Sequence, residues 1–352
     1  IAEVPVMVAN GWSDAKKRAY VLADNKLALN AGWDEEILKL ELDELQELGA
    51  DIELIGFSDD ELAALNPEAE QVPGLTDEDA VPEIPELPVT VEGDVWLLGR
   101  HRLMCGDSTS IDAVETVMDG QNADMVFTDP PYGMFLNTNY DSMFSKDNNH
   151  KKKGDRFDLV KGDHDDFNPD FINTIFAVFS YCKEIFLWGA DYYVDLIPKR
   201  NDGSWVVWDK RCDEKMDKVV GNTFELCWSK AKHKRMVARI LWSGHHGMQK
   251  DDTNTRVHPT QKPVELICWF FDYYSMVDKK IIVDLFGGSG STLIACEKTA
   301  RDCRMMELDP KYCDVIIKRW QDFTGKEATL ESSGLTFSEV QNGRTQAQAN
   351  AA

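Results

Sequence analysis

The stretch KIIVDLFGGSGSTLIACEKTA, residues 280–300, decides the fold of this 352-residue chain. Its apolar start, 281–285, has the composition of a buried strand, and a glycine-rich turn at 287–290 precedes helix-forming residues from Ser291. Glycines let the backbone approach a ligand closely, and the N–H groups at a helix N-terminus attract a carboxylate or phosphate. The stretch therefore predicts the strand–loop–helix unit of a nucleotide-binding fold.

Outward from that stretch, strand-like and helix-like segments alternate along the chain. The strand-like runs are 124–128, 184–188, 204–208, 280–285 and 303–307. The helix-like stretches are 110–119, 170–180, 263–274, 291–300 and 311–323. This alternation predicts an α/β fold with a doubly wound, mostly parallel, Rossmann-like sheet that is covered by helices on both faces.

The flanks differ in composition from this central part, which we place at residues 91–330. A small helical domain is predicted over residues 1–65, where apolar residues recur at helical spacing: Ile37, Leu38, Leu42, Leu45 and Leu48. Residues 66–90 are rich in proline and acid, which is typical of a linker. Residues 331–352 are polar and aperiodic, and we expect a disordered tail there.

The formal net charge of −24 opposes binding to nucleic acid, but the charge is unevenly distributed. Residues 1–90 carry five basic and 22 acidic residues, which leaves 33 basic and 40 acidic residues for the remainder. No run approaches the roughly 18 apolar residues of a membrane helix, and there is no secretory signal. The eight cysteines form no Cys-x-x-Cys pair. We therefore expect a cytoplasmic protein without a membrane span, disulfide framework or zinc site.

A second apolar run, ADMVFTDPPYG at 123–133, ends in Asp129-Pro130-Pro131-Tyr132. The Asp129 carboxylate and the Pro130 carbonyl could accept the two N–H groups of an exocyclic amine and free its lone pair. The prolines offer no competing N–H. Tyr132 could stack on a flipped base. The segment therefore predicts chemistry at a nucleobase amino group.

An acidic residue, Glu307, follows the glycine-rich turn by about 20 residues, where it could bind both ribose hydroxyls of a nucleoside. A dehydrogenase would share this geometry. The amino-group pocket instead favours S-adenosylmethionine (SAM), because an amine can attack the sulfonium methyl in line and positioning supplies much of the rate.

Together these residues resemble the β class of DNA amino-methyltransferases, in which the catalytic motif precedes the SAM loop in a circularly permuted order. The resemblance covers about residues 91–330 and implies that Asp129, Pro130, Pro131 and Tyr132 form the catalytic pocket. In this reading Asp107 contacts the SAM adenine, Glu307 the ribose, and Thr260 and Lys262 the methionine end. The full set of implied SAM-binding residues is Asp107, Ser108, Thr260, Gln261, Lys262, Asp284, Phe286, Gly287, Gly288, Ser289, Gly290, Ser291, Glu307 and Asp309.

By family analogy, Asp129 rather than serine at the first catalytic position favours adenine N6 in double-stranded DNA. An N4-cytosine or RNA amino group is the alternative, whereas C5-cytosine is disfavoured because no Pro-Cys nucleophile segment occurs. The stretch 16–42 resembles the end of a ParB-like domain fused to phage-type methyltransferases. A DNA-binding ParB-like fusion with an inactive methyltransferase domain is therefore a further alternative. The resemblance is compatible with a restriction-modification setting and a homodimer.

Target recognition is predicted within residues 133–257, between the two motifs. The segment KAKHKRMVAR at 230–239 holds five basic residues and no acid. We expect either DNA phosphate contacts or a solvated loop or edge strand. The candidate contacts are Lys230, Lys232, Lys234, Arg235 and Arg239.

Overall fold

The computed structural model describes residues 11–27, 38, 41, 42, 45, 73–133, 167–211, 222–242, 261–274 and 281–351. It divides into two compact units, residues 1–69 and 70–352, and each is described by itself.

The first unit contains helix α1 (Asp14–Leu27), whose Arg18 forms an ion pair with Glu41 at 2.6 Å. Three of the predicted apolar positions, Leu38, Leu42 and Leu45, are helical and buried. Ile37 and Leu48 lie outside the described residues. The helical spacing of the described positions is therefore confirmed.

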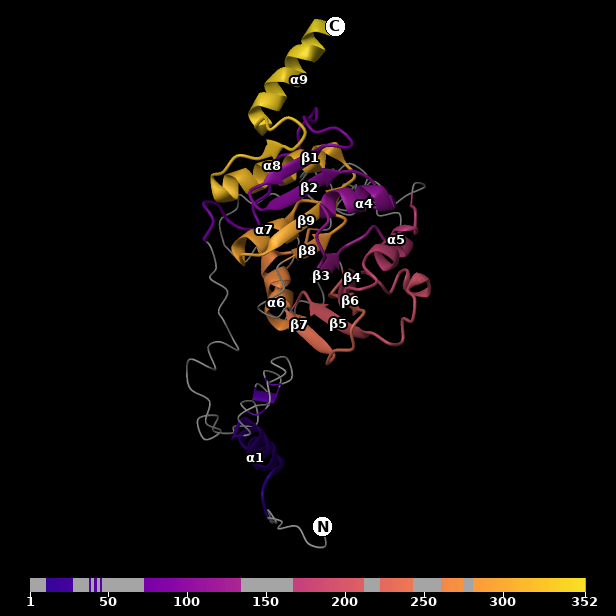
Figure 1. Cartoon of the computed structure of the whole chain (residues 1–352), viewed down its shortest axis with the longest axis vertical. Helices are drawn as coiled ribbons and strands as arrows, with labels where there is room; N and C mark the ends of the chain where they lie inside the picture. The colour runs from indigo at the N-terminus through magenta and orange to yellow at the C-terminus, as the bar shows by residue number, and fades with distance from the viewer. Residues whose placement is uncertain are drawn as a thin grey trace, which may run out of the picture. The chain divides into compact units, whose positions relative to one another are not determined.

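The second unit is built on a sheet that has ten strands within the described residues (Figure 1). Their bounds are β1 (Val95–Leu98), β2 (His101–Cys105), β3 (Met125–Thr128), β4 (Glu184–Trp188), β5 (Ser204–Asp209), β6 (Phe224–Ser229), β7 (Met236–Arg239), β8 (Ile281–Asp284), β9 (Asp302–Glu307) and β10 (Thr329–Leu330). The order is β10-β1-β2-β9-β8-β3-β4-β6-β5-β7. The central strands β2, β9, β8, β3 and β4 are parallel, and antiparallel pairs flank them.

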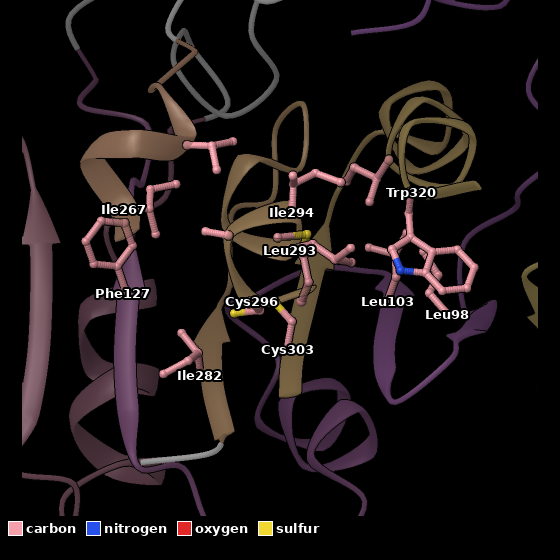
Figure 2. Packing of buried hydrophobic residues seen from close by; sticks show 14 of the residues in the cluster. Leu98, Leu103, Phe127, Ile267, Ile282, Leu293, Ile294, Cys296, Cys303 and Trp320 are labelled. Carbon is pink, nitrogen blue, oxygen red and sulfur yellow. The ribbon is translucent and has the colours of Figure 1, made fainter. Parts of the chain in front are cut away.

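Helices cover both faces of this sheet. They are α4 (Ile111–Met118), α5 (Phe171–Val178), α6 (Val264–Tyr274), α7 (Ser291–Lys298) and α8 (Pro310–Thr324), with a short 3₁₀ helix η3 (Val194–Leu196). Side chains of successive strand residues point to opposite faces, so Phe127 of β3 joins the core under α6, α7 and α8, while Val126 joins the core under α4 and α5. Figure 2 shows the first of these cores, where Leu293, Ile294 and Trp320 pack over the strands.

The doubly wound, mostly parallel α/β sheet is thus confirmed. Each predicted strand agrees with the observed one to within a residue at either end, and each predicted helix to within two. Burial explains this accuracy, because strands covered on both faces are continuous apolar runs.

The predicted linker at 66–90 is wrong for its described part, 73–90, which packs on the second unit. The Asp314 carboxylate of α8 accepts hydrogen bonds from the backbone N–H groups of Val89, at 2.5 Å, and Thr90, at 3.0 Å. Glu78 pairs with Lys298 of α7 at 2.5 Å. Glu78 and Asp79 have partners in the domain, whereas Asp77, Glu83 and Glu86 are exposed.

The predicted disordered tail at 331–352 is also wrong. Helix α9 (Phe337–Ala351) follows β10, which pairs with β1. Phe337 packs against Trp96 with ring centroids 5.3 Å apart, and Arg344 forms an ion pair with Asp94 at 2.7 Å. The Phe337 ring, the buried Val340 and the Arg344 ion pair hold this otherwise polar segment.

Seven cysteines of the described residues are buried in the second unit: Cys105, Cys182, Cys227, Cys268, Cys296, Cys303 and Cys313. Burial raises the pKa of the Cys268 thiol to about 12. Among the helices of the described residues, none combines the length and the apolar character that crossing a membrane requires.

Candidate functional site

The two sequence motifs meet at the carboxyl edge of the sheet, by which we mean the edge where the central parallel strands end. Their strands β3 and β8 are neighbours in the sheet. Across 156 residues of sequence, the Thr128 hydroxyl donates to Asp284 at 2.9 Å. The chain leaves β3 toward α5 on one face and β8 toward α7 on the other. Ligands of doubly wound sheets bind at such a switch point.

The glycine-rich turn after β8 requires glycine at specific positions. Gly288 and Gly290 have φ angles of 52° and 86°, in the left-handed region that disfavours other residues. A Cβ at Gly290 would also lie 3.0 Å from Ile316. Gly290 precedes α7 without a side-chain cap, so the first N–H groups of this helix are available to an anionic group.

Two carboxylates, the buried Asp284 and the half-buried Glu307, flank this turn. Glu307, at the end of β9, accepts hydrogen bonds from the backbone N–H groups of Gly288, at 2.7 Å, and Asp309, at 2.8 Å. Burial raises the pKa of Glu307 to about 7 and that of Asp284 also to about 7. Asp309 additionally caps α8 through the Lys311 N–H. An acceptor beside the glycine turn suits the diol of a nucleoside, so these residues fit SAM.

The end of β2 contributes Asp107 and Ser108 to the same edge, beside β9. Gly106 N–H donates to the Glu307 carbonyl at 3.0 Å. Asp107 is exposed and accepts from the Thr109 N–H and hydroxyl, both at 2.8 Å. The side-chain cap of α4 is Ser110, which leaves the Asp107 carboxylate outside the helix.

The Asp129 carboxylate is held by two groups. Its Oδ1 accepts from the Tyr132 hydroxyl at 2.6 Å, and its Oδ2 pairs with the Lys262 ammonium. Lys262 is buried, whereas the side chain of Asp129 is 22% exposed. Burial raises the pKa of Asp129, and the charge of Lys262 opposes this rise. The family resemblance assigned Lys262 to the methionine end of SAM, whereas the structure has it in contact with Asp129.

A second carboxylate, Glu225, lies on the other side of Lys262 at 3.4 Å and also pairs with Lys210. Although burial favours the neutral acid, the ammonium groups of Lys262 and Lys210 hold the pKa of Glu225 below its usual value. Sequence reasoning missed Glu225, because a single glutamate in a strand carries no motif.

Tyr132 stacks on Tyr192, with ring centroids 5.1 Å apart and an angle of 10° between the planes. A Cβ at Gly189 would collide with the Tyr132 ring at 2.1 Å, so only glycine leaves room for that ring. Tyr192 is 49% exposed. Sequence reasoning missed Tyr192 too, although it lies only four residues beyond β4.

The segment before β1, residues 73–90, contacts the residues on either side of Lys262. Gln261 donates to the Asp79 carbonyl at 3.1 Å, and the Asp79 carboxylate accepts from the Val264 N–H at 2.9 Å. Burial raises the pKa of Asp79 to about 6. These contacts hold the turn that carries Lys262. Thr260, one residue before this turn, lies outside the described residues.

Arg319 of α8 ties the same segment to the glycine turn. Its guanidinium donates to the Ser289 carbonyl at 2.9 Å and to the Glu78 carbonyl at 2.6 Å. It also lies 3.3 Å from the Ser291 hydroxyl. The hydroxyls of Ser289 and Ser291 are therefore partly engaged by the fold.

The predicted DNA contacts do not lie together. Because β7 is parallel to β5, and β5 runs with β4, Arg239 at the end of β7 lies at the carboxyl edge. Lys232, Lys234 and Arg235 precede β7 and lie toward the opposite edge. Lys230 donates to the carbonyls of Ser180 and Cys182, at 2.8 and 2.7 Å. We therefore keep only Arg239 among the five.

The rest of the predicted recognition region, at 134–166, 212–221 and 243–257, lies outside the described residues. Within the part of the chain that the structure describes, no group of three or more histidine, cysteine or acidic residues could hold a metal ion.

Two family models match parts of the chain. Residues 204–319 match the N6/N4 family described as DNA methylase, and residues 36–92 match the ParB-methyltransferase HTH domain. The second match extends past the predicted boundary at residue 65, and the domain boundaries stay predictions.

The chain is similar to several solved structures, two of which illustrate the range. One is M1.HpyAVI in complex with SAM, at 17% identity over 62% of this chain and 98% of that chain, with a TM-score of 0.38. The other is the PvuII DNA methyltransferase (cytosine-N4-specific), at 12% identity over 74% of this chain and 94% of that chain, with a TM-score of 0.38. No curated protein matches the chain.

The family match covers β5 to α8 and includes the glycine turn and Glu307. Residues 204–319 are therefore similar to N6/N4 DNA methylases, and residues 36–92 are similar to the ParB-methyltransferase HTH domain.

Proposed function

We propose that this enzyme methylates N6 of adenine in double-stranded DNA, after the target base flips into a pocket formed by Asp129, Pro130, Pro131 and Tyr132. The observation that carries the proposal is the partly exposed Asp129 carboxylate, which follows the strand next to the glycine turn. An acceptor beside a methyl-donor site is what an exocyclic amine requires.

In this proposal the Asp129 carboxylate accepts one N–H of the amino group, and the Pro130 carbonyl accepts the other. Both bonds favour a pyramidal nitrogen whose lone pair is available for attack. Bound SAM supplies an electrophilic methyl group and a thioether leaving group. The nitrogen gains the methyl and loses one proton, which Asp129 can accept and pass to solvent.

Cofactor binding in this proposal uses the carboxyl ends of β2, β8 and β9. Glu307 accepts from the ribose hydroxyls, Asp107 contacts the adenine, and the N-terminus of α7 faces the methionine carboxylate. Gln261 and Asp284 act through the backbone that they hold. The contact between Lys262 and Asp129 favours a role at the base rather than at the methionine end.

Adenine is preferred over cytosine because the catalytic motif begins with aspartate, by analogy with the family. N4-cytosine is the second candidate, since an exocyclic amine of either base presents the same two N–H groups. Arg239 at the carboxyl edge is available to a DNA phosphate. A homodimer stays a proposal drawn from the family alone.

The test is an assay with labelled SAM and duplex DNA, followed by mass spectrometry of the nucleosides. We expect N6-methyladenine from the wild type and none from Asp129→Ala. The matched control is Asp191→Ala, because Asp191 is an exposed aspartate next to Tyr192.

If the product is N4-methylcytosine, the target base is cytosine rather than adenine. Full activity of Asp129→Ala would refute the role of Asp129. SAM binding without methyl transfer to any duplex would favour the inactive, DNA-binding alternative.

A further inference from the structure

Lys262 lies between two carboxylates that belong to different parts of the sheet. Its ammonium pairs with Asp129 Oδ2 and lies 3.4 Å from Glu225 Oε2. The two acids are thus alternative acceptors for one buried cation. The role of this cation rests on the proposed function, in which Asp129 receives the amino group of the target base.

The contact between Lys262 and Asp129 opposes that function. Asp129 Oδ1 already accepts from the Tyr132 hydroxyl, and Oδ2 pairs with Lys262. An ammonium on this carboxylate competes with the incoming N–H group. It also repels the positive charge that develops on the amine as it gains a methyl group.

Glu225 offers Lys262 a second place. Its Oε1 is bound by Lys210, whereas Oε2 makes no shorter contact among the described residues than the 3.4 Å to Lys262. Charge-assisted hydrogen bonds are about 2.7–2.9 Å long, so a shift of under about 1 Å would complete this bond.

The path between the two acids is lined by an aromatic face. The Lys262 ammonium lies 4.9 Å from the centroid of the Trp188 ring. The negative face of an indole stabilises a cation that moves across it. The charge therefore need not enter water as it moves from one carboxylate to the other.

We propose that Lys262 and Glu225 are positioning residues that exchange partners during the reaction. Lys262 pairs with Asp129 between turnovers and shifts to Glu225 Oε2 when the amino group of the base donates to Asp129. Lys210 stays on Glu225 Oε1 and holds this second acceptor in place. No proton is transferred in this exchange, so the cluster keeps its charge.

The experiment uses the full chain with Glu225→Gln, Lys262→Met and the double variant. Single-turnover methyl transfer, its pH profile and SAM affinity by calorimetry are measured for each. We expect Glu225→Gln to lower the single-turnover rate by about 10- to 100-fold, because Lys262 then stays on Asp129 and competes with the amino group that must be positioned there. Its SAM affinity should remain within about twofold.

The pH profile separates exchange from mere support. Lys262→Met removes the charge that favours the Asp129 carboxylate, so the acid limb of its profile moves to higher pH. Under exchange, Glu225→Gln keeps Lys262 on Asp129 and also removes a negative charge that raises the pKa of Asp129, so the acid limb moves to lower pH. A shift of the Glu225→Gln limb to higher pH would mean that Glu225 only holds Lys262 in place, and it would overturn the proposal.

The double variant supplies a second criterion. If Glu225 acts by receiving Lys262, its loss should cost little once Lys262 is gone, and the double variant should be as active as Lys262→Met. If the activity losses of the two single variants multiply in the double variant, the result would contradict the exchange. The control is Glu265→Gln, an exposed glutamate on α6 that should behave as wild type.

Failure of this inference differs from failure of the proposed function. A wild type that methylates neither adenine nor cytosine would refute the proposed function. A wild type that methylates DNA at the same rate as Glu225→Gln would refute only the exchange.

Discussion

Two clusters of buried charged side chains contain similar residues, but they shift the pKa of their central carboxyl group in opposite directions. The first surrounds Glu297 of α7, which lies 2.6 Å from His101 Nε2 and accepts from Trp320 Nε1 at 3.1 Å. His101 Nδ1 accepts the backbone N–H of Cys303, so Nε2 carries the proton and donates to Glu297. Against the effect of burial, these bonds hold the pKa of Glu297 at about 2.

The second cluster surrounds Asp129, where burial outweighs the neighbouring charge of Lys262 and raises the pKa. The fold therefore stabilises the ionised form of Glu297 and destabilises that of Asp129. A carboxylate that the fold favours contributes to stability, whereas one held against a cost is typical of a functional site. The pKa direction separates the two clusters more clearly than burial does.

The largest effect that would test this contrast is expected from Asp129→Asn. Methyl transfer should fall by about 10²- to 10⁴-fold, because the amide is a weak acceptor for the amine and cannot take its proton. The free energy of unfolding should change by less than about 1 kcal/mol, since Lys262 keeps Glu225 as a partner. Single-turnover rates and urea unfolding measure the two, with Asp191→Asn as control. A large loss of stability in Asp129→Asn would mean that Asp129, like Glu297, stabilises the fold, and the contrast between the two clusters would not hold.

Glu297→Gln should do the reverse. Stability at pH 7 should fall by roughly 2–3 kcal/mol, while the rate per folded molecule stays unchanged. Because the pKa in the fold lies below the usual 4.5, this stabilisation is present above pH 4.5 and is lost as the pH falls toward 2. The difference in the free energy of unfolding between variant and wild type, measured by urea unfolding, should therefore become smaller from pH 7 to pH 3. Exposed Glu327→Gln is the control.

Arg319→Lys tests a cation that joins the glycine turn to Glu78 in the segment before β1. Loss of the guanidinium leaves the carbonyls of Ser289 and Glu78 without a donor, at a cost of about 1–3 kcal/mol. Because Ser289 belongs to the glycine turn, SAM affinity should fall severalfold as well. Calorimetry and thermal unfolding check both, against exposed Lys318→Met. Unchanged SAM affinity would restrict Arg319 to a structural role.

The smallest effect is expected at Glu307. Burial raises the pKa of this carboxyl group to about 7. The ionised carboxylate is the better acceptor for ribose hydroxyls, so SAM affinity should weaken about two- to fivefold from pH 8 to pH 6. Glu307→Gln should bind SAM more weakly and without this pH dependence. Identical pH profiles for variant and wild type would separate Glu307 from the cofactor.

The sequence allowed the sheet and the motif strands to be predicted, because strands buried on both faces are apolar runs and glycine turns are local. Asp129 and the turn at 286–290 could be predicted because each directly follows an apolar strand run in the sequence. The sequence did not predict that the two motifs lie side by side, and the pairing of β3 with β8 brings them together.

Other parts of the site depend on contacts between distant segments, which no local pattern reveals. Lys262 meets Asp129 across 133 residues and Arg319 reaches Glu78 across 241. Residues 73–90 resemble a linker in composition, and contacts such as those of Glu78 with Lys298 and of Val89 with Asp314 form only in the fold. The basic segment at 230–239 was judged from its charge, whereas the direction of β7 decides which residues reach the carboxyl edge.

The buried cysteines have a practical consequence for fluorescence work. Alkylating dyes react with thiolates that solvent can reach, and the seven described cysteines are buried. Once Cys212, outside the described residues, is replaced, a single cysteine introduced at exposed Tyr181 would take up dye selectively. Tyr181 is remote from the carboxyl edge, because it precedes β4 at the opposite edge. A dye can therefore be attached at this position without removal of the native core thiols.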